Sequence, residues 1–468
     1  MSSTSHTITE QKGFYKLSWL QRIGFGSGDL AQNLIYQTVA IYLLFFYTNV
    51  FGISPGAAAF MFGIVRIVDV LWDPFVGALV DKSSPKWGKY RSYLVLCGIP
   101  LTGLFILTFW YGFSGQLWYA YITYVSFSLF YTLINVPYGA LNASLTRDTD
   151  EITKLTSVRM FMANLGGFIV SFGLPALIQS LSPNNDWSKP AASGVWFTIM
   201  CIYGLVCLCL LFFCFTQTKE RVVMDDDKKE TVRYSDLFTE FVRNRPLRVL
   251  AFFFITSFAM MAISNSASPY YMQYNVGHQE YLKWFNGLGS VPALMFFFVP
   301  AIKRKIGKKQ MFYAFLIVAI IGMALLYALS MFDATKSNIW LIFIAQFIKS
   351  TGVIVATGYM WALVPEVISY GEWKSGRRIS GVVNALTGIF FKAGFALGGL
   401  LPGIVLALTN FNAKLEVQSS FTQQGILWLM CVIPALFLLL AMFIISKYEL
   451  DDQTIDKINR EIEERSLQ

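Results

Sequence analysis

Three charged residues lie within one long apolar segment of the chain. The segment spans residues 56–80 and carries Arg66, Asp69 and Asp73 near its middle. A helical period places the two aspartates on one face, with Arg66 three residues before Asp69 on the same side. A charge at bilayer depth costs roughly 2.5–3.5 kcal/mol on insertion scales, so such residues face a bundle interior or an aqueous path. Two carboxylates that project together attract a cation or a shared proton, which is the chemistry of a cation-coupled transporter.

The charges within or beside the apolar segments do not balance. Four cations face three anions, and a bound coupling cation would add one more positive charge. Because an unpaired charge is expensive at this depth, an anionic substrate would improve the balance. The alternative is that Glu366 pairs with one cation and the substrate is a neutral pentoside or glycoside. The seven residues counted are Asp29, Arg66, Asp69, Asp73, Arg159, Lys349 and Lys392.

These residues must be positioned by membrane-spanning helices. Hydrophobic residues make up 55% of the chain and charged residues 14%, and the charges are concentrated between apolar runs of about 20 residues. Residues 1–28 are polar and lack the apolar core of a signal peptide. We therefore predict an all-α polytopic membrane protein with twelve spans, at 29–50, 55–80, 93–112, 117–138, 157–180, 193–215, 247–272, 282–301, 311–331, 338–364, 380–408 and 423–446.

The distribution of Lys and Arg predicts the orientation of the spans. Basic residues gather in alternate loops, which places both termini in the cytoplasm of a bacterial-type inner membrane. The net charge of +9 is then explained by an anionic inner leaflet, without any nucleic acid.

The longest polar interruption, residues 216–246, divides the spans into six and six. The basic turns 82–91 and 303–309 occupy equivalent places in the two halves, which indicates an internal repeat. Parallel six-helix repeats around a midplane site describe the major facilitator architecture. The predicted segments are a cytoplasmic N-terminus (1–28), two six-helix bundles (29–215 and 247–446), the linker between them (216–246) and a cytoplasmic tail (447–468).

Seven short motifs, in order and in matching topology, resemble the glycoside–pentoside–hexuronide:cation symporters, which are typified by the melibiose permease. The resemblance runs from about residue 22 to 445. It implies the major facilitator fold and uphill sugar transport driven by a cation gradient. The motifs are GFGSGDLAQN (24–33), RIVDVLWDP (66–74), KWGKYRSY (86–93), YTLINVPYGAL (131–141), VRMF (158–161), PEVISYGEWKSGRRISG (365–381) and FFKAGFALGG (390–399).

The resemblance also implies roles for individual residues. The family's cation site corresponds to Asp69 and Asp73, with a hydroxyl from Thr132. Its sugar site corresponds to Asp29 and Arg159, and Lys392 is implied as a charged partner near both sites.

This chain departs from the melibiose type at two positions. Asn135 stands where that type has an acidic residue, and Gly139 stands where it has a tryptophan. The departures disfavour melibiose as the substrate, place Asn135 among the candidate substrate ligands, and leave Na⁺ and H⁺ both open as the coupling ion.

Two further groups of residues are candidates for substrate binding and gating. Inward aromatic rings can stack on the face of a sugar, and Tyr131 and Trp361 lie near the polar motifs, as do Tyr36 and Tyr138. Lys349 joins the substrate site as the extra cation. The residues predicted to form a gate at the cytoplasmic ends are Arg66, Glu366, Glu372, Arg377 and Arg378.

Other classes of function find little support in the sequence. No GxxxxGK[ST] loop occurs, and the two histidines form no nucleophile, base or metal constellation, so neither a nucleotide-driven pump nor an enzyme is expected. We expect a monomer with no cofactor, whose partners are a sugar or glycoside, the transported Na⁺ or H⁺ and membrane lipids. The alternatives are a transporter or exporter of an acidic sugar derivative or other organic anion, and a membrane sugar sensor that does not transport.

Overall fold

A computed structural model describes residues 15–83, 85–146, 149–221, 234–292, 299–332, 338–376 and 380–466. All regular elements in these ranges are helical. Nine helical stretches among the described residues are long and apolar enough to cross a membrane. The charged helix α2 (Pro55–Lys82) has 28 residues, about 42 Å at 1.5 Å per residue, and is also long enough to span a bilayer.

The N-terminal half contains α1 to α8 and several short π- or 3₁₀-helical turns, labelled η. Helix α1 packs along α6 and α8, and α2 packs against α5. The elements of this half are α1 (Trp19–Phe45), η1 (Phe46–Phe51), α2 (Pro55–Lys82), α3 (Ser92–Leu96), α4 (Gly98–Thr108), α5 (Leu117–Leu145), α6 (Thr149–Phe168), η2 (Ile169–Gly173), α7 (Leu174–Leu181), η3 (Pro183–Asn185), η4 (Pro190–Ala192) and α8 (Ser193–Gln217).

The C-terminal half follows the same plan, with α10 packed along α17 and α19 and with α13 packed along α15. Its elements are α9 (Tyr234–Arg243), α10 (Arg245–Tyr270), η6 (Tyr271–Val276), η7 (Gln279–Tyr281), α11 (Leu282–Ser290), α12 (Val299–Ile306), α13 (Lys308–Met331), α15 (Ile339–Tyr359), η9 (Met360–Leu363), α16 (Val364–Ser375), α17 (Ser380–Leu408), α18 (Ser420–Leu427), η10 (Trp428–Val432), α19 (Ile433–Ser446) and α20 (Asp452–Ser466).

The first helix begins earlier than the apolar pattern predicts. Helix α1 starts at Trp19, because Ser18 and Gln21 form a capping box in which each side chain accepts a hydrogen bond from the other's backbone N–H. The polar, glycine-rich turn before Asp29 is helical and buried against neighbouring helices. Asp29 therefore lies about three turns into the helix and does not cap it.

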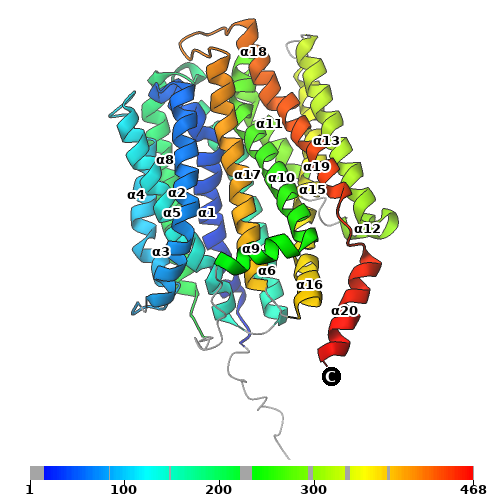
Figure 1. The fold of residues 1–468 in the computed structure, drawn as a ribbon. Coiled ribbons are helices and arrows are strands. Elements are labelled where there is room, and N and C mark those ends of the chain that lie inside the picture. Colours follow the sequence, from blue (N-terminus) through cyan, green and yellow to red (C-terminus); the bar gives the residue numbers. More distant parts are fainter. Residues whose placement is uncertain are drawn as a thin grey trace, which may run out of the picture.

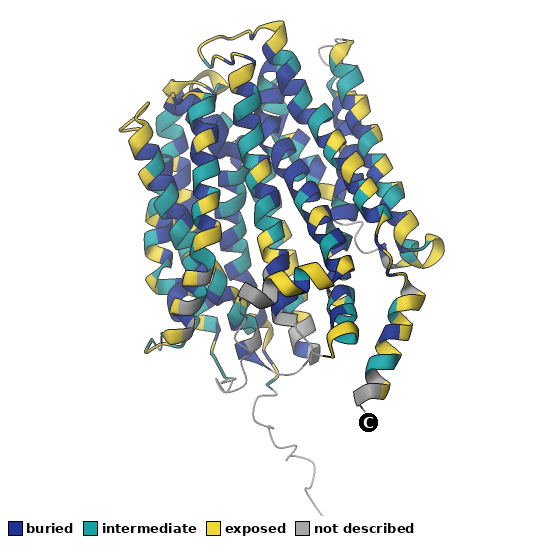
Figure 2. Cartoon of the chain, in the orientation of Figure 1, coloured by how far each residue is buried: buried dark blue, intermediate teal, exposed yellow. Residues whose placement is uncertain are grey.

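Helices α1 and α10 form the centre of the bundle, where they contact each other and carry long runs of buried residues (Figures 1 and 2). Both helices end in a π-helical turn, η1 and η6, followed by a glycine in the left-handed region. The φ angles are 90° at Gly52 and 77° at Gly277. This shared ending fits the predicted repeat. The division at 216–246 stays a prediction, since residues 222–233 lie outside the described part of the chain.

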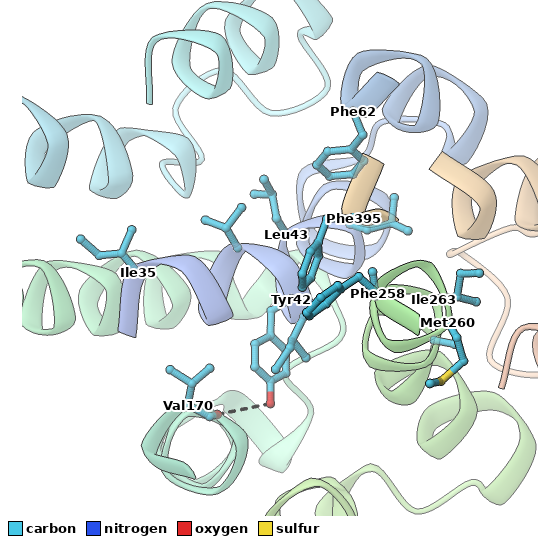
Figure 3. Close-up of a cluster of buried hydrophobic side chains, with 14 of the residues drawn as sticks. Ile35, Tyr42, Leu43, Phe62, Val170, Phe258, Met260, Ile263 and Phe395 are labelled. Atoms are coloured by element: carbon cyan, nitrogen blue, oxygen red, sulfur yellow. Dashed lines mark hydrogen bonds between the residues drawn. The ribbon is translucent and has the colours of Figure 1, made fainter. Parts of the chain in front are cut away.

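A cluster of buried side chains connects the two halves (Figure 3). It contains Tyr42 of α1 and Phe258 of α10, and Phe258 stacks on Phe395 of α17 at 5.4 Å between ring centroids. Tyr36 of α1 meets the same Phe395 ring edge-on at 5.6 Å. The Tyr42 hydroxyl donates a hydrogen bond of 3.5 Å to the Val170 carbonyl. The Tyr36–Phe395 pair thus joins the two halves through an aromatic contact.

Helices α13 and α15 approach closely through small residues. A Cβ atom at Gly352 would overlap the backbone of Phe315 and Ala319, and one at Gly322 would overlap the backbone of Lys349. Glycine at such contacts allows membrane helices to pack tightly.

We predict that Gly352→Ala lowers the free energy of unfolding by about 1–3 kcal/mol, because the added methyl group forces the two helices apart. The matched control is Gly103→Ala on α4, where a Cβ atom meets nothing within 4 Å. Thermal unfolding of the purified protein in detergent should show a lower Tm for the first variant only. Equal Tm values for the two variants would contradict the close packing.

Candidate functional site

The predicted sugar-site pair forms between α1 and α6. Arg159 binds Asp29 through two hydrogen bonds, Nε to Oδ2 at 2.6 Å and Nη2 to Oδ1 at 3.2 Å. The Tyr138 hydroxyl of α5 lies 2.7 Å from Asp29 Oδ2 and 2.6 Å from the Phe25 carbonyl oxygen. The guanidinium also lies over the Phe25 and Tyr138 rings. Three helices therefore position this carboxylate, and Tyr138 contacts it directly.

A second pair lies within α2. Arg66 Nη1 donates to Asp69 Oδ2 at 3.1 Å, as the three-residue spacing predicts. The Ser128 hydroxyl of α5 donates to the other oxygen, Asp69 Oδ1. Asp69 is only 4% exposed, and both of its carboxylate oxygens have partners. Ser128 was not among the residues predicted from the sequence, although it lies one helical turn before Thr132 on the same face of α5.

The third pair joins the two halves of the molecule. Lys392 of α17 donates to Asp73 Oδ2 of α2, across a helix contact between residues 319 positions apart in the chain. Asp73 Oδ1 is buried and has no hydrogen-bond partner among the described residues. The neighbouring Trp72 Nε1–H donates to the Leu129 carbonyl at 3.1 Å and fixes the register of α2 against α5. A buried carboxylate oxygen without a donor is free to bind a cation or a proton.

Three further candidates lie on α5 between Ser128 and Tyr138, and they differ in burial. Thr132 is buried one turn beyond Ser128, on the face of α5 that meets α2. Tyr131 stacks on Tyr36 with ring centroids 5.7 Å apart. Asn135 is exposed, and its side chain makes no hydrogen bond that the structure shows, so it can meet a ligand.

Trp361 lies in an aromatic cluster of the C-terminal half. Its ring meets Phe254 at 4.8 Å and Phe391 at 6.1 Å between centroids, yet 47% of the residue is exposed. Phe391 directly precedes Lys392 in α17, so Trp361 packs on the helix that carries the cation of the third pair. An exposed tryptophan held by other rings is a surface on which a sugar face can stack.

Lys349 differs from the other three intramembrane cations. It is 5% exposed, donates to Ser264 Oγ of α10 at 2.9 Å, and lies 5.9 Å from the centroid of the Phe285 ring. No carboxylate among the described residues pairs with it. The structure therefore places Lys349 inside the C-terminal helices, where it joins α15 to α10.

The predicted cytoplasmic gate is described only in part. Glu366 of α16 accepts hydrogen bonds from Lys308 Nζ at 2.7 and 2.8 Å and from the Tyr448 hydroxyl at 3.0 Å. Burial, together with Glu366, raises the pKa of Tyr448 well above its usual range. Glu366 thus links three segments of the C-terminal half; the sequence predicted Glu366 as a gate residue but did not pair it with Lys308 or Tyr448.

Of the other gate candidates, the structure describes Arg66 and Glu372. Glu372 lies on α16, Arg66 is engaged with Asp69, and Arg377 and Arg378 lie outside the described residues. A gate formed by these residues stays a prediction.

Comparison with known proteins identifies the family. The profile of the family described as "MFS/sugar transport protein" matches residues 24–452. The chain belongs to this family. It is 44% identical over 454 residues to the "Uncharacterized symporter YnaJ" of Bacillus subtilis (strain 168), with 96% of each chain covered. It is 31% identical over 465 residues to the "Glucuronide carrier protein homolog" of Escherichia coli (strain K12), again with 96% of each chain covered.

Among solved structures, the crystal structure of a D-xylose–proton symporter superposes with a TM-score of 0.66 at 15% identity. The match covers 93% of this chain and 99% of that chain. The all-α major facilitator fold and the resemblance to cation-coupled sugar symporters are therefore confirmed. The chain is a membrane transporter of this superfamily, and its family points away from an enzyme.

We predict that Arg159→Lys weakens substrate transport by about tenfold or more, since an ammonium cannot reproduce the two-pronged contact with Asp29 and about 1.4 kcal/mol corresponds to a factor of ten. The matched control is Arg22→Lys, which alters a similar buried pair with Glu151 near the start of α1. The control should lower Tm and leave the KM for uptake unchanged. An unchanged KM and kcat in Arg159→Lys would exclude the pair from the substrate site.

Proposed function

We propose that this protein is a symporter in which Asp73 and Asp69 bind the coupling cation, Na⁺ or H⁺, and the Asp29–Arg159–Tyr138 group binds a glycoside, pentoside or hexuronide. The observation that carries the proposal is the Asp73–Lys392 ion pair between α2 and α17. One carboxylate oxygen of Asp73 is taken by the lysine of the other half, and the second is buried without a donor. Cation binding at the free oxygen competes with Lys392 for the charge of Asp73 and so acts on the contact between the halves.

The residues around the Asp73–Lys392 pair fit a cation site on α2 and a sugar site between the two halves. Asp69 lies one turn before Asp73, and Ser128 and Thr132 supply hydroxyl groups from α5. The sugar candidates Tyr131 and Trp361 lie on the two halves, so a ring between them would contact both. The D-xylose–proton symporter shares the fold, and the similar Bacillus subtilis protein is named a symporter, which supports coupled sugar transport.

A set of polar contacts between the halves supports alternating access. Thr48 and Tyr270 share a hydrogen bond of 2.6 Å, and Asn49 Nδ2 donates to the Tyr274 hydroxyl at 2.5 Å. In the orientation predicted from Lys and Arg, these contacts close the extracytoplasmic ends of α1 and α10. The described conformation is then closed on the outside, and rocking of the halves must break these bonds.

The loops beyond these helix ends add further contacts. Gln279 Nε2 donates to Asp186 Oδ1 at 3.1 Å, and Lys189 pairs with Glu416 at 3.0 Å. Burial alone would raise the pKa of the Asp186 carboxyl, but hydrogen bonds from Ser188, Gln279 and Lys189 hold it below its usual value. Asp186 therefore stays charged at neutral pH and can hold the loops of the two halves together.

We predict that Asp73→Asn and Asp69→Asn each lower gradient-driven accumulation by about tenfold or more, because each removes a ligand for the coupling cation. Purified protein in liposomes should be given imposed Na⁺ or H⁺ gradients and a panel of glycosides that includes methyl xyloside and methyl glucuronide. The exposed Asp456→Asn on α20 is the matched control and should accumulate sugar normally. Uphill uptake by both site variants at the unsubstituted rate would remove coupling from these carboxylates. No uptake of any glycoside by the unsubstituted chain would favour a sensor.

A second candidate is transport of an acidic glycoside, and Lys349 is the observation that favours it. Each of the other three intramembrane cations has its own aspartate, whereas Lys349 has a serine and an aromatic ring. A carboxylate on the substrate would supply the missing charge. The similarity to a glucuronide carrier homologue agrees with this assignment.

We predict that Lys349→Gln then weakens transport of methyl glucuronide by about tenfold, as expected for a lost buried charge pair, and leaves methyl xyloside transport unchanged. Initial uptake rates for the two glycosides provide the measurement, and each serves as the control for the other. If a neutral xyloside is the better substrate and the variant carries it normally, the substrate is not anionic.

A further inference from the structure

The short helix α9 (Tyr234–Arg243) has a different orientation from the spanning helices. It runs across α17 and α10, and it contacts both (Figure 1). A single residue, Asn244, separates it from α10, and Asn244 caps that helix by accepting a hydrogen bond from the Leu247 N–H at 3.0 Å. The position of α9 is therefore fixed to the first turn of α10.

One face of α9 is bound to the bundle. Glu240 is buried and accepts a hydrogen bond of 2.8 Å from Asn244 Nδ2, which also donates to the Val367 carbonyl at 3.0 Å. Phe241 packs on Phe390 of α17 with ring centroids 5.6 Å apart. These contacts hold the helix against the outside of α17 and α16.

The opposite face carries apolar side chains that no part of the described chain covers. Phe238 is 72% exposed and Val242 is 48% exposed. Their spacing of four residues places them together on the helix. The exposed Arg243 directly follows Val242 in the last turn of α9, and Arg245, in the first turn of α10, is exposed and pairs with Glu449 at 2.7 Å. An apolar face bordered by cations is typical of a helix that lies in the surface of an anionic membrane.

The length of the adjoining span places α9 at the depth that such a helix needs. Residues Arg245–Val276 form a continuous helical stretch of 32 residues, about 48 Å at 1.5 Å per residue. This is close to the 40–45 Å thickness of a bilayer with its headgroup regions. The first turn of α10 therefore lies in the headgroup layer, and α9 is attached at that level across the outer side of the bundle.

We propose that α9 is an interfacial helix whose Phe238 and Val242 insert into the boundary between headgroups and acyl chains of an anionic cytoplasmic leaflet. The bilayer covers the apolar face, while Glu240, Asn244 and Phe241 attach the helix to the bundle. In this arrangement the membrane surface holds the start of α10, a central helix of the C-terminal half.

The test compares neighbouring positions on the two faces. A bimane fluorophore is attached at Phe238→Cys, at Val242→Cys or at the matched control Thr239→Cys, which is exposed but lies on the adjoining polar face. The chain is reconstituted in phosphatidylglycerol/phosphatidylcholine vesicles, and the signal from native cysteines is subtracted by labelling the unsubstituted protein. Quenching is measured with doxyl groups near the lipid headgroups and with iodide on both sides of the membrane.

The proposal expects lipid quenching at least twofold stronger at positions 238 and 242 than at 239, with iodide showing the reverse order. Replacing phosphatidylglycerol by phosphatidylcholine should reduce lipid quenching at both apolar positions. Equal quenching at 238 and 239 would overturn the proposal by placing α9 in water. Shielding of 238 and 242 from both quenchers would overturn it as well, because another protein segment would then cover the face. Two labelled positions keep the test valid if one variant does not fold.

Discussion

A charge in a low-dielectric interior must be paired, and Asp73 and Lys392 meet this requirement by pairing across the contact between the two halves of the protein. Removing one partner of an intramembrane ion pair is costly, because the other charge is left without compensation. Here the partners lie on α2 and α17, in different bundles. Any motion that separates these helices must provide another counter-charge for Asp73 and for Lys392. A bound cation and a bound substrate can provide them.

The other intramembrane pairs differ from this one in a consistent way. Arg66–Asp69 lies within one helix, and Asp29–Arg159 lies within the N-terminal bundle. Both pairs can persist while the bundles rock as rigid bodies. The motion must therefore change the Asp73–Lys392 contact, and Asp73 is the carboxylate with a free oxygen. A cation that binds this oxygen can thus control the separation of the two halves. Elsewhere the halves meet through the Tyr36–Phe395 ring contact and through hydrogen bonds such as Thr48–Tyr270, which are cheaper to rearrange than an intramembrane ion pair.

The sequence was sufficient for the fold class and for contacts set by local geometry. Apolar runs of span length identified the polytopic architecture, and the helical period placed Arg66 beside Asp69. Resemblance to a family placed Asp29 with Arg159, a pair that spacing alone could not reveal because the residues are 130 positions apart. The same holds for Lys392 and Asp73, which the resemblance located only as neighbours.

Other features depend on packing that leaves no clear pattern in the sequence. Ser128 resembles other small residues in an apolar helix, and only the packing of α2 against α5 brings it to Asp69. Glu366 was predicted as a gate residue, but its partners Lys308 and Tyr448 lie 58 and 82 positions away, so spacing could not identify them. The early start of α1 escaped prediction because residues 19–28 are not apolar; their capping box and close helix contacts make them helical. The exposed apolar face of α9 could not be predicted either, because the linker 216–246 that contains it is mostly polar and charged.

In the proposed mechanism, the cation and the sugar act on one another through Asp73. Coupling of this kind is reciprocal, so the affinity for sugar must depend on the cation to the same degree as the affinity for the cation depends on sugar. The most direct measurement is the equilibrium Kd of a transported glycoside for the purified protein, taken across a series of Na⁺ concentrations and of pH values at constant ionic strength. We predict that one of the two cations tightens sugar binding to the unsubstituted chain and has no effect on Asp73→Asn, which still binds the sugar. The same cation dependence in Asp73→Asn, or no dependence on either cation in the unsubstituted chain, would contradict the account.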